Sequence, residues 1–98
     1  MSSTSDVRTK ENVIPIQNPL TIINQLNGVY FNFISVDPSK QRVGLIAQDV
    51  QSNLPQVVFE DQEGYLSVSY GNIVALLIEG IKDLHAQVAT LQGMSKTP

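Results

Sequence analysis

The clearest feature of the chain is a row of apolar residues near its C-terminus that recurs every three or four positions. Its members are Val74, Leu77, Ile81, Leu84, Val88 and Leu91, spaced 3, 4, 3, 4 and 3 residues apart. This spacing predicts one long helix over about residues 72–92, with a heptad seam of β-branched residues at position a and Leu at position d. Before residue 81 the apolar face is wider, as in a helix packed on a domain, and after it only the seam remains. We therefore expect a helix that is buried at its start and projects at its end as an oligomeric coiled coil.

The same spacing also fits an ordinary amphipathic helix that lies on its own domain, because fewer than three heptads are a weak coiled-coil signal. Gly80 lowers the stability of the helix by about 1 kcal/mol relative to Ala, so the helix needs a packing partner in either case. β-branched residues at a with Leu at d usually favour a coil of two helices, but this coil is too short to set the number alone.

The first part of the chain predicts an exposed arm and then a short helix. Residues 1–12 are polar and lack hydrophobic periodicity, which indicates an N-terminal arm. Asn18 and Pro19 predict a helix start, with the Asn side chain as the cap, and the Asn-Gly pair at residues 27–28 predicts its end.

Short strands and a second short helix follow. Residues 29–34 are aromatic and β-branched and predict a strand, and residues 47–54 predict a helix that stops before Pro55. Residues 57–68 predict a hairpin with Gly64 at the turn position that needs a positive φ. The expected fold class is α+β: a small mixed core in residues 13–72, the long helix or coil in 73–92 and a frayed tail in 93–98.

Composition narrows the possible functions. With 98 residues the chain is expected to form one domain, and its net charge of −3 with scattered Lys and Arg offers no basic face for nucleic acid. It has no cysteine, which excludes disulfides and thiolate metal sites, and its single histidine, His85, cannot build a metal site alone. The longest apolar stretch, residues 73–78, is too short to span a membrane, and the polar start does not have the pattern of a signal peptide. We expect no metal, no cofactor and no membrane partner.

Three segments carry a family resemblance. They are residues 5–13 (SDVRTKENV), residues 44–50 (GLIAQDV) followed by Leu54-Pro55, and residues 67–70 (SVSY) leading into residues 76–82 (LLIEGIK). In this order and spacing the chain resembles the intramolecular chaperone domains at the C-termini of bacteriophage endosialidases, tail spikes and tail fibres, to which a domain of the myelin regulatory factor is related. Ser69 and Gly80 depart from the family, where acidic and Ala residues are more typical.

The resemblance implies a homotrimer that promotes folding of a phage tail fibre or spike and then releases itself. We expect its three chains to meet partly through a trimeric coiled coil of the seam residues Val74, Leu77, Ile81, Leu84, Val88 and Leu91. Ser5 would be the nucleophile and Lys10 the general base of a Ser–Lys dyad, and the cleavage site would comprise Thr4, Ser5 and Asp6, with the side of Ser5 left open. The implied partner is the upstream fibre or spike polypeptide, with no small-molecule ligand, and the implied place is the host cytoplasm during virion assembly. Two alternatives are a trimerisation tip that never cleaves and a separately encoded chaperone that acts in trans, which Met1 permits.

This chemistry makes two demands on the arm. A serine hydroxyl needs a base, and a lysine is one only when neutral, so its pKa must fall from about 10.4 by roughly 3 units, which burial can supply. Arg8 would assist and Glu11 would oppose this shift. Residues five apart lie about 140° apart around a helix and on opposite faces of a strand, so neither element brings Ser5 to Lys10. The arm must bend, or the pair must form across a subunit boundary, and we expect cleavage to wait for assembly.

The other polar residues are expected to have structural roles. We expect His85, at heptad position e, to be a surface residue, and Asp49, Asp61 and Glu63 to be solvated charges. Tyr70 is expected to be a core residue with its hydroxyl at the edge.

Overall fold

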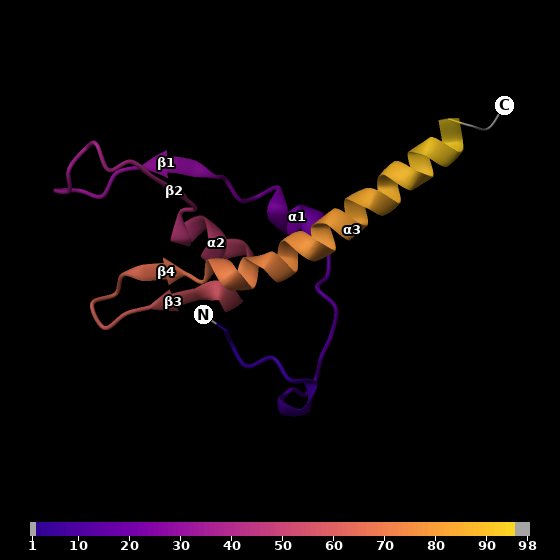
Figure 1. Cartoon of the computed structure of the whole chain (residues 1–98), viewed down its shortest axis with the longest axis horizontal. Helices are drawn as coiled ribbons and strands as arrows, with labels where there is room; N and C mark the ends of the chain where they lie inside the picture. Colours follow the sequence, from indigo (N-terminus) through magenta and orange to yellow (C-terminus); the bar gives the residue numbers. More distant parts are fainter. Residues whose placement is uncertain (1, 96–98) are drawn as a thin grey trace.

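The computed structural model describes residues 2–95 and has the expected α+β class. The elements in chain order are the 3-10 helix η1 (Val7–Thr9), α1 (Pro19–Ile23), β1 (Val29–Phe31), β2 (Arg42–Gly44), α2 (Ala47–Asn53), the 3-10 helix η2 (Pro55–Val57), β3 (Val58–Glu60), β4 (Leu66–Val68) and α3 (Tyr70–Ser95). Figure 1 shows two hairpins on one side, α3 running out on the other, and the N-terminal arm as a loop apart from both. Within the described residues, no helix has the length and apolar character needed to cross a membrane.

The four strands form two separate antiparallel pairs. In one, Val29 pairs with Gly44, and in the other Val58 pairs with Val68. The second hairpin confirms the predicted role of Gly64, whose φ is 88°. The first strand is shorter than predicted because Ser35 takes a φ of 66° and Val36 donates a backbone hydrogen bond to the carbonyl of Phe33. Residues 32–34 therefore lie outside the strand, in the irregular segment that leads into this turn, and their prediction as strand is wrong.

The first helix also differs from its prediction. Asn18 has a left-handed φ of 51° and its side chain makes no capping hydrogen bond, so the predicted side-chain cap is wrong. Its backbone carbonyl accepts instead from Ile22 N, and Pro19 begins the helix as predicted. The helix ends at Ile23, well before Gly28, because the amides of Gln25 and Leu26 bond to carbonyls only three residues back.

The core is small for a chain of this length. Val50, Val57, Ile73 and Leu76 are the buried hydrophobic side chains of the described residues. The radius of gyration is 17.9 Å, whereas a compact domain of 98 residues is expected to have about 13 Å. Many large apolar side chains stay exposed on the single chain, which is typical of a protein that binds other molecules through them.

Helix α3 is longer than predicted, starting at Tyr70 and ending at Ser95. Residues 93–95, predicted to be part of a frayed tail, are helical, and residues 96–98 of that tail lie outside the described residues. The buried residues of α3 are Ile73, Leu76 and Gly80, and beyond Gly80 the described helix leaves the body of the chain. The expectation of a helix that is buried at its start and projects at its end is confirmed (Figure 1).

Gly80 lies where α1 crosses α3. A Cβ atom at this position would overlap the terminal carbon of Ile23 and approach Leu20 Cδ2 to 3.7 Å. The glycine therefore lets the two helices approach closely, which offsets its low helix propensity.

Candidate active site and assembly face

The arm reverses direction through a single 3-10 turn, η1. Thr9 N donates to the carbonyl of Asp6 over 3.0 Å, and Lys10 N donates to the carbonyl of Val7 over 3.1 Å. This turn is the bend that the spacing of Ser5 and Lys10 demands, and it forms within one chain. A pair across a subunit boundary is therefore not required.

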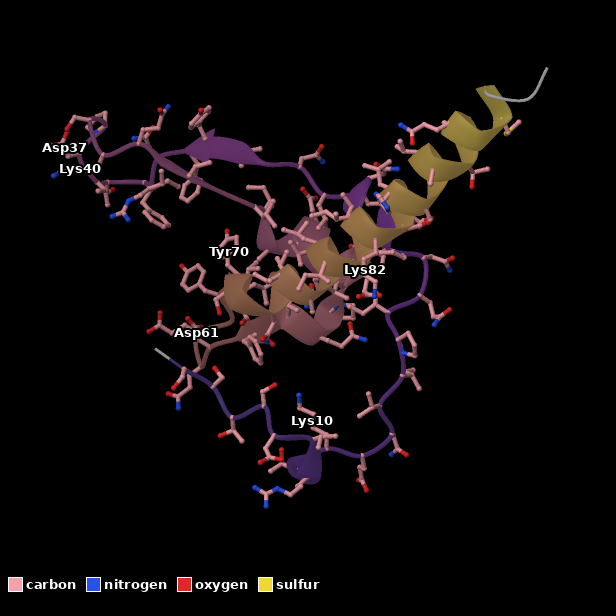
Figure 2. All side chains as sticks on the ribbon, turned by 45° about the vertical axis from the view of Figure 1, so that its right-hand side comes forward. Lys10, Asp37, Lys40, Asp61, Tyr70 and Lys82 are labelled. Atoms are coloured by element: carbon pink, nitrogen blue, oxygen red, sulfur yellow. The ribbon has the colours of Figure 1, made fainter. Side chains whose placement is uncertain are left out.

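The turn brings the two predicted site residues together. Lys10 Nζ lies 2.8 Å from Ser5 Oγ, within hydrogen-bond distance. A charged amine donates this hydrogen bond, and a neutral amine at the same place can accept the hydroxyl proton. Figure 2 shows Lys10 on the arm, apart from the packed body of the chain.

The pair is exposed to solvent in the single chain. Every residue from 2 to 15 is exposed, including Ser5, Lys10 and the predicted cleavage-site residues Thr4 and Asp6. The burial that a lysine base needs is therefore not supplied by this chain alone.

Arg8 forms an ion pair that was not predicted from the sequence. Its guanidinium binds the Asp6 carboxylate, with Nη2 to Oδ2 at 2.8 Å and Nε to Oδ1 at 3.1 Å. This pairing raises the pKa of Arg8, and the side-chain bond and then the Arg8 backbone N–H lower the pKa of Asp6. Because Asp6 offsets its charge, Arg8 is not the isolated cation beside the dyad that the sequence suggests.

A pH titration tests the Asp6–Arg8 pair. The pKa of Asp6 is lowered in the folded chain, so its carboxylate stabilises the turn fully at a pH above the pKa of an unfolded Asp, about 3.9. This stabilisation is lost as the pH falls through the lowered pKa of the folded chain. We expect the Asp6 carboxyl carbon, followed by NMR, to titrate below the ordinary Asp range and to shift upward in Arg8→Ala. Equal midpoints in the two proteins would contradict the pairing.

The heptad seam forms a separate exposed face on α3. All six seam residues are between 44% and 68% exposed, whereas Ile73 and Leu76 on a neighbouring stripe are buried against the domain. The helix thus packs on its own domain through one stripe and leaves the seam uncovered by the described chain. The seam residue Leu77 also lines a groove together with Ile23 and Leu26.

The remaining candidates have structural roles. Tyr70 is 51% exposed, so the prediction of a core residue is wrong, but its hydroxyl accepts a hydrogen bond from Leu45 N at 2.9 Å. The Tyr70 hydroxyl oxygen lies so close to Gly44 that a Cβ atom at Gly44 would be 2.6 Å from it.

Asp61 Oδ1 accepts from the amides of Glu63 and Tyr65 and so shapes the second hairpin turn. His85 is exposed on α3, and residues 2–95 contain no group of three or more potential metal ligands.

Sequence reasoning missed what Asp6 and Thr9 do. Asp6 Oδ1 accepts from Arg8 N, two residues on, and Thr9 Oγ1 donates to the Asp6 carbonyl at 2.7 Å. The available signal was the aspartate itself, because Asp commonly bonds the amide two residues ahead and starts a turn.

This fold and arm define a small α+β domain that carries a serine–lysine pair on its arm and an unpartnered helical seam. The family model Peptidase S74, described as "Chaperone of endosialidase", matches residues 5–59, and the match begins at Ser5. The chain therefore belongs to the chaperone-of-endosialidase family.

Its relatives include tail fibre proteins of bacteriophages. The long tail fiber protein Gp37 of Enterobacteria phage K3 is 38% identical over 90% of this chain, and that of Enterobacteria phage T2 is likewise 38% identical over 90%. The corresponding protein of Escherichia phage AR1 is 29% identical over 81% of the chain. The chain spans only 7–8% of the length of these proteins.

Proposed function

We propose that this chain is a C-terminal chaperone domain of a phage tail fibre or spike, which assembles as a homotrimer and then cuts itself off beside Ser5. The observation that carries the proposal is the 2.8 Å contact between Lys10 Nζ and Ser5 Oγ, at the residue where the family match begins. The likeness to Gp37 fibre proteins supports a fibre polypeptide as the client. The setting that follows is the host cytoplasm during virion assembly.

Ring geometry favours the bond on the N-terminal side of Ser5. Attack of Ser5 Oγ on the Thr4 carbonyl carbon closes a five-membered ring, whereas attack on the carbonyl of Ser5 itself would close a strained four-membered ring. A neutral Lys10 amine takes the hydroxyl proton as the new C–O bond forms, and returns it to the Ser5 nitrogen as the Thr4–Ser5 C–N bond breaks. Water then hydrolyses the resulting ester, which leaves a carboxylate on Thr4 and a free amine and hydroxyl on Ser5.

The exposed seam supports assembly through α3. A row of half-exposed apolar residues at six successive a and d positions is the kind of surface that other helices cover in a coiled coil. β-branched residues at position a favour two strands, and a coil of this length is too short to set the number. We choose three because the family resemblance implies a homotrimer. Copies packed around the seam and the small core are also what would exclude water from the arm, so that cleavage follows assembly.

The test is intact-protein mass spectrometry on the complete fibre protein that carries this domain. The native protein is expected to give two fragments that meet at the Thr4–Ser5 bond, and Ser5→Ala and Lys10→Ala are expected to stay whole. Lys10→Arg keeps the positive charge but cannot act as a base at neutral pH, so it should stay whole too.

Matched controls are Ser3→Ala on the same arm and Lys40→Ala in the first hairpin, both exposed, which should cut like the native protein. A native protein that assembles but stays whole would leave a non-cleaving trimerisation tip. Rescue of fibre folding by this chain expressed separately would instead indicate a chaperone that acts in trans.

A further inference from the structure

The Ser5–Lys10 contact lies in a segment of the arm for which the described residues show no side-chain hydrogen bond to the body of the chain. The side-chain hydrogen bonds of residues 5–10 all go to other residues of the same segment. Because this segment is exposed throughout, packing on the body cannot fix the bend. The positions of the two site residues must therefore be set locally.

Asp6 is the centre of that local network. Its carboxylate accepts from Arg8 N at 2.9 Å and from the Arg8 guanidinium, through Nη2 at 2.8 Å and Nε at 3.1 and 3.2 Å. Its backbone carbonyl accepts from Thr9 N at 3.0 Å and from Thr9 Oγ1 at 2.7 Å. Asp6 thus binds both Arg8 and Thr9, the last two residues of the turn that returns the chain to Lys10.

Asp6 is also joined directly to Ser5 by a peptide bond. Its extended backbone, with φ −65° and ψ 131°, is held by the same bonds that begin the 3-10 turn. Asp6 therefore fixes the direction from which Ser5 approaches and the direction in which the chain returns. It forms no hydrogen bond with Ser5 Oγ or Lys10 Nζ, so it acts through the backbone and through Arg8.

We propose that Asp6, braced by Arg8 and Thr9, is the positioning residue that holds Lys10 against Ser5. This inference rests on the proposed self-cleavage and explains why a dyad can be built on an exposed arm. Most of the positioning comes from the hydrogen bond between the Asp6 carboxylate and Arg8 N. The ion pair with the Arg8 guanidinium adds less, because exposed ion pairs contribute little to stability.

Four variants separate the hydrogen bond between the Asp6 carboxylate and Arg8 N from the ion pair between that carboxylate and the Arg8 guanidinium. In Asp6→Ala both are lost, and first-order cleavage should slow by about 10- to 100-fold, since a small misplacement of reacting groups reduces rates on this scale. Asp6→Asn keeps an oxygen that can accept from Arg8 N and should restore the rate to within about fivefold of native. Asp6→Glu keeps the charge but lengthens the side chain, and should stay nearly as slow as Asp6→Ala. Arg8→Ala removes only the ion pair and should slow cleavage a fewfold at most.

The matched control is Asp37→Ala. Asp37 Oδ1 accepts from Ser39 N at 3.0 Å, in the same kind of turn, but in the first hairpin and far from the arm in sequence. Its replacement should leave the cleavage rate unchanged. Trimer yield is measured in every sample, because a residue needed only for folding would lower the yield and would not be rescued by Asn in preference to Glu.

A second measurement does not depend on cleavage. In the 98-residue chain, NMR contacts between the Ser5 β-protons and the Lys10 ε-protons should be present in the native protein and weaken in Asp6→Ala. If native fibre protein never cuts, self-cleavage fails, and these contacts alone decide whether Asp6 holds the pair. Unchanged contacts in Asp6→Ala, or an unchanged cutting rate in an active protein, would overturn the positioning role.

Discussion

Replacing Ile81 and Leu84 together by Asp is expected to leave the chain monomeric and to abolish cleavage of the fibre protein. These side chains are 68% and 52% exposed on the single chain and lie at successive a and d positions of the seam. Burying each in a coil contributes roughly 1.5–3 kcal/mol per chain, and an unpaired carboxylate in its place adds a desolvation penalty. In the proposed trimer, this loss occurs in each of the three chains, and we expect it to prevent association.

Sedimentation of the 98-residue chain and mass spectrometry of the fibre protein measure the two effects separately. The control variant carries Asp at Ala86 and Ala89, exposed positions of the same helix outside the seam, which add the same charge. A double seam variant that still forms trimers would show that the seam is not the interface. A monomeric variant that cuts at the native rate would show that cleavage does not wait for assembly.

Replacing Gly80 by Leu is expected to separate α1 from α3 and to destabilise the chain by about 1–3 kcal/mol, the usual range for overpacking a filled site. Gly80 is buried, and even a Cβ atom would overlap Ile23, so a leucine side chain has no room. Gly80→Ala should be nearly neutral, since a gain of about 1 kcal/mol in helix propensity opposes displacement of one movable terminal carbon.

Denaturant unfolding of the 98-residue chain measures both Gly80 variants. Gly93→Leu is the matched control, because a Cβ there would meet open space, and it should not destabilise the chain. If Gly80→Leu unfolds at the same denaturant concentration as the native chain, the close approach of α1 and α3 contributes nothing to stability.

The long helix, the short helix before Pro55 and the hairpin at Gly64 could be predicted because each depends on residues close together in sequence. The failures involve choices that local patterns do not determine. Asn18 uses its backbone carbonyl where a side-chain cap was expected, and Tyr70 is held by the amide of Leu45, which lies 25 residues away. Residues 32–34 have strand propensity, but the turn at Ser35 takes them out of the pairing.

The candidate site was partly predictable for the same reason. The spacing of Ser5 and Lys10 required a bend, and the structure provides it, but the role of Asp6 follows from a hydrogen-bond network that spacing does not reveal. The surroundings that would keep Lys10 neutral could not be predicted from the sequence, because the arm is exposed on a single chain and such surroundings must come from other chains.

The separation of the arm from the body has a consequence for timing. The candidate pair lies within six consecutive exposed residues, 5–10, whose side-chain hydrogen bonds stay within that segment, so the folding of its own domain does not change its surroundings. Under the proposed mechanism it can respond only to what neighbouring chains bring around it. The cut would then act as a checkpoint on the assembly: a correctly folded but solitary subunit keeps its client attached, and release marks the arrival of the last partner.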